Sequence, residues 1–325
     1  MMRGRATVRP VIGRRSDPFN AGVRTTYLGT SEFAATVLRR LADSPHLPAL
    51  VVTPSDSRRG RGRRLASPPA AEAARELGLE LHQTPNVNSA HSVRAIRATG
   101  PEAIAVCAFG QLIKEPLLSE FLMLNVHPSL VPRWRGAAPI ERALMAGDRE
   151  TGVSIMRVTA GLDSGPIALA EPVAIAEEDD YATLSAKLAE LGGELLVRVL
   201  HALESGELDF TDQDEAAATY AAKIAPDERR LRPSRTAPEL ERIVRALTPH
   251  IGAYLELEEG GRLGVRSARA VAGGPEPGQI EASAEGLLLG SMDGGLRLEV
   301  VQPPGGKPMT AAEFLRGHPS PAKAL

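Results

Sequence analysis

Two polar side chains, Asn125 and His127, are separated by one apolar residue in the stretch L-N-V-H-P-S-L-V-P (residues 124–132). In a strand this spacing places both side chains on the same face of the sheet. Pro128 and Pro132 prevent the strand from continuing in a hydrogen-bonded ladder or turning directly into a helix. A strand that ends on polar side chains and turns sharply is where an open α/β sheet forms a binding site. An amide and an imidazole there could donate hydrogen bonds to a reacting oxygen, or could simply cap the strand and bond to loop amides.

Asp163 is a third candidate, in the glycine-flanked stretch A-G-L-D-S-G-P-I (residues 160–167). Gly161 and Gly165 allow the backbone to approach other groups closely. An aspartate between two glycines is usually a turn former whose carboxylate accepts a local backbone hydrogen bond. The residues alone therefore favour a turn former over a site carboxylate at Asp163.

Three segments carry a resemblance to a known family. The pattern N-x-H-P-S-L-x-P (residues 125–132) resembles the signature of 10-formyltetrahydrofolate-dependent formyltransferases. Its continuation R-W-R-G-A-A-P-I (133–140) is similar to methionyl-tRNA formyltransferases in particular, and residues 160–167 resemble the third segment of the family. The resemblance runs from about Tyr27 to about Pro308.

This resemblance implies transfer of a formyl group from 10-formyltetrahydrofolate to the α-amine of initiator methionyl-tRNA, with Asn125, His127 and Asp163 as catalytic residues. An α-amine with a pKa of about 7.7–8.0 is partly neutral near pH 7. Asn125 and a protonated His127 could each donate a hydrogen bond to the formyl oxygen. Because an ordinary aspartate, with a pKa of about 3.9, is too weak a base for an ammonium group, we expect Asp163 to orient and charge His127 and to relay a proton through water.

The resemblance also implies two folate-contacting segments, one at the turn after an apolar strand and one within the central motif. Val131 stands where leucine is commoner in the family, and the Val131–Pro132 bond is a candidate for a cis peptide. The corresponding residues are Phe109, Gly110, Gln111, Leu112, Ser129, Leu130, Val131 and Pro132. In the second part of the chain, T-P-H-I-G-A keeps Pro249 of the family's N-P-W-P-G-A but lacks its aromatic residue, which weakens an expected stacking role there.

Arginines gather in two segments that the resemblance assigns to tRNA. Each arginine that pairs with a phosphate releases counterions and adds salt-dependent affinity, although a charged run is more often simply a solvated loop. The first segment, S-D-S-R-R-G-R-G-R-R, contains Arg58, Arg59, Arg61, Arg63 and Arg64. The second segment, a charged connector, contains Arg229, Arg230 and Arg232.

Composition limits the remaining possibilities. The net charge of −2 provides no global attraction for nucleic acid, so any contact must come from local patches. The single cysteine, Cys107, excludes an intrachain disulfide and suits a reducing compartment. We see no apolar run of about 18 residues that would span a membrane. We also see no His- or Cys-rich spacing typical of a metal site, so we expect no metal ion. We expect a monomer in the bacterial cytoplasm.

These residues must be positioned by the surrounding strands and helices. Their expected order predicts an open, mostly parallel Rossmann-like sheet, the formyltransferase fold, followed by a small OB-like β-barrel. Short apolar strands at Thr25–Leu28, Leu47–Val52, Ile104–Cys107 and Met123–Val126 alternate with helices, the longest at Tyr181–Leu203. Residues 1–22 are Arg-rich and acid-poor; we interpret them as a disordered extension or a misassigned start rather than a transit peptide. We expect a catalytic domain at 23–225, a linker at 226–237 and a tRNA-binding domain at 238–325.

Alternatives to this function remain open. A sugar-nucleotide amine formyltransferase would use the same donor and the same two-domain plan. A glycinamide ribonucleotide formyltransferase would need only the first domain, and a formyltetrahydrofolate hydrolase would use water in place of the amine. A non-catalytic tRNA-binding protein belongs to a different class and would not need the three polar residues.

Overall fold

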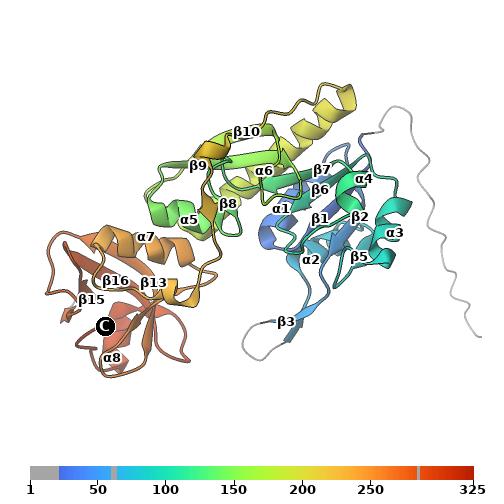
Figure 1. Ribbon diagram of the computed structural model, residues 1–325. Coiled ribbons are helices and arrows are strands. Elements are labelled where there is room, and N and C mark those ends of the chain that lie inside the picture. Colours follow the sequence, from blue (N-terminus) through green and yellow to red (C-terminus); the bar gives the residue numbers. More distant parts are fainter. Residues whose placement is uncertain (1–21, 60–63, 284–285) are drawn as a thin grey trace, which may run out of the picture.

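The computed structural model describes residues 22–59, 64–283 and 286–325 (Figure 1). A seven-stranded sheet forms the centre of the first part of the chain. Five strands are parallel, β9 runs antiparallel to β7, and β10 runs antiparallel to β9, which confirms the predicted mostly parallel sheet. In spatial order the strands are β10 (Ile167–Ala174), β9 (Glu150–Arg157), β7 (Met123–His127), β6 (Ala103–Cys107), β1 (Thr25–Gly29), β2 (Pro48–Thr53) and β5 (Leu81–Gln83).

Helices cover both faces of this sheet because its strands are apolar on both sides. In β1, Tyr27 belongs to the core on one face and the next residue, Leu28, to the core on the other. This two-sided burial is typical of parallel strands. One face packs on α1 (Glu32–Ala42), α2 (Pro69–Glu76) and α6 (Tyr181–Ser205), and the other on α3 (Ala90–Ala98) and α4 (Leu117–Glu120).

Local sequence explains where several helices begin and end. Ser31 caps the start of α1, where its side chain accepts a hydrogen bond from the Ala34 backbone N–H. Helix α5 (Pro139–Ala146) begins at a proline and ends at Gly147, whose φ of +77° favours glycine. Asp180 and Thr183 form a capping box at the start of α6.

A second, antiparallel sheet organises the C-terminal part of the chain, around its own core. Helices α7 (Ala237–Leu247) and α8 (Ala311–Gly317) pack on it. Its path is β12 (Ala253–Glu256), β13 (Arg262–Val271), β16 (Gly295–Gln302), β15 (Gly286–Gly290) and β14 (Ile280–Ser283), and β17 (Met309–Thr310) pairs with β16. Residues near the C-terminus bridge both ends of this path, through Ala324 to Leu257 and Lys323 to Gln279.

Several elements were not expected from the sequence. Strand β10 contains Pro172 and small residues, and it lies at the edge of the first sheet, where proline is tolerated. Two-residue strands β8 (Arg135–Gly136) and β11 (Tyr220–Ala221) pair with each other. Strands β3 (Ser57–Arg59) and β4 (Arg64–Ala66) form a hairpin that projects from the first sheet (Figure 1). The remaining short elements are the 3-10 turns Glu215–Ala217 and Pro226–Arg229.

Candidate active site

A cavity of about 540 Å³ lies at the carboxyl ends of the central strands. Strand β1 lies between β2 and β6, so the chain reverses its direction of travel across the sheet at this point. Open α/β sheets bind ligands in the crevice that such a reversal creates. The lining includes Ser31, Phe33, Phe109, Gly110, Gln111, Asn125, His127, Pro128, Ile140, Glu141, Leu162, Asp163 and Tyr181.

The three candidate catalytic side chains meet in this cavity. The Asn125 amide donates a long hydrogen bond of 3.4 Å to Asp163 Oδ1. His127 Nδ1 lies 3.8 Å from Asp163 Oδ2, an ion-pair distance that is too long for a direct hydrogen bond. The His127 side chain is 5% exposed and that of Asp163 18%, so the two groups interact in a largely dry environment.

One contact fixes which ring nitrogen of His127 faces the cavity. Nε2 lies 2.9 Å from the backbone carbonyl oxygen of Trp134. Because a carbonyl oxygen can only accept, Nε2 carries a proton and donates it. The remaining nitrogen, Nδ1, is therefore the one that can gain or lose a proton beside Asp163.

Asp163 does not act as a local turn former. Its Oδ2 accepts a hydrogen bond of 2.9 Å from the backbone N–H of Gly136, 27 residues away, and its Oδ1 faces Asn125. The residue holds a left-handed φ of +46°, which is costly for a residue other than glycine. A Cβ on Gly165 would lie 1.8 Å from the Arg157 carbonyl oxygen, so only glycine permits the close approach of this loop to β9.

Comparisons with known proteins bear on the identity of this site. Residues 23–200 match the family described as Formyl transferase, and residues 223–319 match its C-terminal domain. The chain is 42% identical over 295 residues to a methionyl-tRNA formyltransferase of Pseudomonas paraeruginosa, covering 90% of this chain and 95% of that protein. It is 40% identical over 299 residues to that of Halorhodospira halophila, covering 90% and 96%. The chain belongs to the methionyl-tRNA formyltransferase family.

Solved structures share the formyltransferase fold at much lower identity. HypX from Aquifex aeolicus in complex with tetrahydrofolic acid aligns with a TM-score of 0.65 and 17% identity, over 94% of this chain and 51% of that larger one. The sugar 3N-formyl transferase WlaRD aligns with a TM-score of 0.60 and 14% identity, over 85% of this chain and 96% of that chain. At these identities the likeness concerns the fold alone.

The predicted folate-contacting residues of this formyltransferase separate into two groups. Phe109, Gly110 and Gln111 line the cavity, and the Gln111 amide binds backbone groups of Thr84 and Val87. Leu112 is 72% exposed and lies outside the described lining.

The second group, residues 129–132, also lies outside this lining and is held by neighbouring segments. Ser129 donates to the Arg133 carbonyl oxygen, and Leu130 packs against Gly152. The Val131–Pro132 peptide bond is cis, as considered above. Folate contact by residues 129–132 and by Leu112 stays a prediction.

The R-W-R-G part of the family motif holds the loop next to the site through ion pairs and hydrogen bonds. Arg133 binds Asp148 through two nitrogens at 2.9 and 2.6 Å, and the Trp134 indole N–H donates to the same carboxylate. Arg135 is 1% exposed and binds Glu215 through both terminal nitrogens, at 2.9 and 2.8 Å. These arginines hold the loop that presents the Trp134 carbonyl to His127 and the Gly136 N–H to Asp163.

The arginine-rich hairpin of the formyltransferase is only partly described. Arg58 and Arg59 lie in β3 and Arg64 in β4. The Arg58 side chain is exposed. The side chains of Arg59 and Arg64, and the whole of Arg61 and Arg63, lie outside the described residues.

The connector arginines have partners within the protein. Arg229 donates to the carbonyl oxygens of Ile251 and Gly252, and Arg230 forms an ion pair of 2.8 Å with Glu256. Arg232 is exposed. Arg229 and Arg230 thus fasten the connector to the second sheet, whereas contact of the three arginines with tRNA stays a prediction.

The second part of the formyltransferase contacts the wall of the cavity through one histidine. His250, in T-P-H-I-G-A, stacks on Tyr181 with ring centroids 3.6 Å apart. Its Nε2 donates a 3.0 Å hydrogen bond to Glu141. Tyr181 and Glu141 both line the cavity. The expectation that stacking is weakened at this position was therefore wrong, because histidine supplies the aromatic ring.

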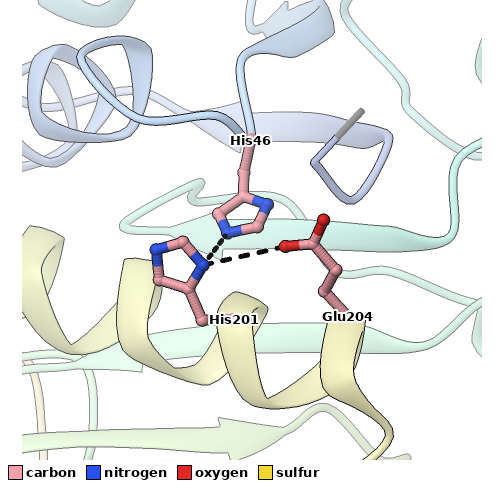
Figure 2. A group of neighbouring side chains, drawn as sticks. All are labelled: His46, His201 and Glu204. Atoms are coloured by element: carbon pink, nitrogen blue, oxygen red, sulfur yellow. Dashed lines mark hydrogen bonds and ion pairs between the residues drawn. The ribbon is translucent and has the colours of Figure 1, made fainter. Parts of the chain in front are cut away.

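Among the described residues, one group outside this cavity offers three potential metal ligands: His46, His201 and Glu204 (Figure 2). His46 Nδ1 accepts a hydrogen bond from the Val23 backbone N–H at 3.0 Å, so the neutral ring carries its proton on Nε2. That Nε2 faces His201 Nδ1 at 3.1 Å. A metal-bound histidine normally donates from its other ring nitrogen, so this donor set suits a hydrogen-bonded histidine pair better than a metal ion.

Proposed function

We propose that this chain transfers the formyl group of 10-formyltetrahydrofolate to the α-amine of initiator methionyl-tRNA. The observation that carries the proposal is the meeting of Asn125, His127 and Asp163 in one cavity, although 38 residues separate Asn125 from Asp163. An amide donor, an imidazole and a carboxylate around one point are the groups that an acyl transfer to an amine requires. The family membership of the chain supports the same substrates.

The reaction exchanges one carbon–nitrogen bond for another. The neutral α-amine attacks the formyl carbon, and a tetrahedral intermediate with a negatively charged oxygen forms. The bond from that carbon to N10 of the folate then breaks. The amine loses one proton and N10 gains one, so the transfer needs no oxidant, reductant or net proton.

Each of the three side chains has a proposed task. The Asn125 amide donates a hydrogen bond to the developing oxyanion, and this bond strengthens as negative charge accumulates on the oxygen. His127, held by its Nε2–H bond to Trp134, presents Nδ1 for a charge-assisted hydrogen bond or for proton transfer. Asp163 Oδ2, which lies 3.8 Å from Nδ1, balances the positive charge of His127, and the carboxylate relays a proton through water.

The rest of the chain supplies binding. Phe109, Gly110 and Gln111 contact the folate from the turn after β6. Residues 129–132 and Leu112 contact it as well. The hairpin arginines 58, 59, 61, 63 and 64 and connector arginines 229, 230 and 232 contact tRNA phosphates. Residues 23–225 form the catalytic domain, 226–237 the linker and 238–325 the tRNA-binding domain of a monomer that works in the bacterial cytoplasm. No helix in the described part of the chain has the length and apolarity to cross a membrane.

The purified full-length chain should formylate charged initiator tRNA when 10-formyltetrahydrofolate is supplied. Formyl-methionine released from the tRNA is measured against time, at several salt concentrations. Activity should fall steeply as salt rises, because phosphate contacts displace counterions. UDP-aminosugars serve as competing acceptors. Their formylation in place of methionyl-tRNA would instead support the sugar-nucleotide alternative.

A further inference from the structure

Gln213 lies in the polar stretch after α6 and contacts the loop that carries Asp163. Its side-chain Nε2 donates to the Asp163 carbonyl oxygen at 3.0 Å and to the Gly165 carbonyl oxygen at 2.6 Å. One amide group therefore holds the backbone of this loop at Asp163 and again two residues later, at Gly165. Because Gln213 contacts the backbone, the carboxylate of Asp163 stays available to Asn125, His127 and the Gly136 N–H.

The side chain of Gln213 is itself held in place by the buried guanidinium group of Arg135. Its Oε1 accepts a hydrogen bond of 3.0 Å from Arg135 Nε, and the two terminal nitrogens of Arg135 are occupied by Glu215. An arginine that is 1% exposed and bound on three nitrogens has little freedom to move. The Gln213 amide is thereby oriented with its oxygen toward Arg135 and its N–H groups toward the loop.

The same arginine begins the two-residue strand β8, whose next residue, Gly136, donates its N–H to Asp163 Oδ2. Arg135 and Gln213 thus connect the two supports of Asp163, one for its carboxylate and one for its backbone. Asp163 needs such support because its φ of +46° is unfavourable for an aspartate. Strained residues at functional sites persist only where several surrounding contacts determine their conformation.

We propose that Gln213 is a positioning residue for formyl transfer, which sets the place of the Asp163 carboxylate relative to His127 by holding the Asp163 loop against Arg135. The inference rests on the proposed function of Asp163. It assigns no contact with either substrate to Gln213. Its loss should therefore lower kcat and leave KM for methionyl-tRNA and for 10-formyltetrahydrofolate nearly unchanged.

Two substitutions separate the contacts of Gln213. Gln213→Met keeps the volume of the side chain but removes the donors and the acceptor. Gln213→Glu keeps an acceptor for Arg135 but, when ionised, cannot donate to the two carbonyl oxygens. Both should reduce kcat by about 10- to 100-fold, the range expected when a reacting group moves by up to an ångström.

The chain contains a matched control in its second sheet. Gln302 accepts from Arg266 Nε and Nη2 at 3.0 and 2.6 Å and donates from Nε2 to the Gly306 carbonyl oxygen at 2.8 Å. Gln302→Met therefore removes the same kinds of bonds away from the cavity. It should lower the thermal unfolding temperature about as much as Gln213→Met and leave kcat within about twofold of the unchanged chain.

A second readout needs no substrate, so it is independent of the proposed function. The ring resonances of His127 in an NMR spectrum should move in Gln213→Met and Gln213→Glu, and stay in place in Gln302→Met. If Gln213→Met does not fold, both kcat and the His127 resonances are measured on Gln213→Glu, which retains the Arg135 contact. Wild-type kcat together with unmoved His127 resonances in a folded Gln213 variant would overturn the positioning role. Lack of formylation by the unchanged chain, with His127 resonances that do move, would instead count against the proposed function.

Discussion

His250 stacks on Tyr181, with ring centroids 3.6 Å apart and an angle of 23° between the ring planes. The contact joins the C-terminal part of the chain to helix α6 at the wall of the cavity. The same imidazole donates to Glu141, whose side chain is 12% exposed. His250, which lies outside the first sheet, thus contacts two residues that line the cavity, Tyr181 and Glu141.

Replacing His250 by alanine should therefore affect both stability and activity. The Glu141 carboxylate would lose its partner while remaining mostly buried, which costs about 1–3 kcal/mol. We expect a lower thermal unfolding temperature and a several-fold decrease in kcat/KM for methionyl-tRNA. His318→Ala is the matched control, because His318 stacks on Phe314 in the same part of the chain and Phe314, unlike Tyr181, does not line the cavity. Equal kinetic effects of the two variants would contradict a special role for His250.

Asn125→Ala tests the oxyanion assignment. Loss of one hydrogen-bond donor to a developing oxyanion typically lowers kcat by about 100- to 1,000-fold. Because this bond strengthens mainly in the transition state, KM for the two substrates should change little. Steady-state kinetics with each substrate varied in turn gives both parameters. A kcat within threefold of the unchanged chain would remove Asn125 from the chemistry.

The sequence predicted those parts of the molecule that depend on local pattern. Apolar runs identified the parallel strands, and the spacing of Asn125 and His127 placed them together at the end of β7. Strand β10 escaped prediction because Pro172 is unfavourable inside a sheet and small residues give no clear alternation. The role of Gln213 was not predicted because its partners Asp163 and Arg135 lie 50 and 78 residues away in the sequence. Polar residues whose roles depend on such distant contacts leave no periodic signal in the chain.

Two glycines that flank Asp163 should respond differently to alanine. A Cβ at Gly165 would lie 1.8 Å from the Arg157 backbone oxygen, which cannot move without disturbing β9. A Cβ at Gly161 would meet the Ser164 hydroxyl at 2.2 Å, the end of a side chain that can rotate away. Gly165→Ala should therefore reduce kcat by at least about 10-fold and lower the unfolding temperature. Gly161→Ala should retain most of the activity, and similar losses in both variants would show that loop flexibility rather than close packing is limiting.

The histidine pair in Figure 2 makes stability depend on pH. Burial lowers the pKa of His46 below its usual 6.5, the positive charge that His201 can carry lowers it further, and Glu204 partly opposes this shift. Between the usual pKa of about 6.5 and the lower folded value, the unfolded chain binds more protons than the folded chain at His46, so the free energy of unfolding falls as the pH falls.

His46→Asn provides the comparison for this pH dependence, because the asparagine oxygen can still accept from the Val23 N–H and cannot take up a proton in this range. We expect urea unfolding of the unchanged chain between about pH 7 and pH 5 to show a decreasing free energy of unfolding, and the variant to show a smaller decrease. His318→Asn serves as a control at an exposed histidine in the C-terminal part of the chain. A decrease in His46→Asn as steep as that of the unchanged chain would show that other groups, rather than His46, bind the protons that destabilise the fold.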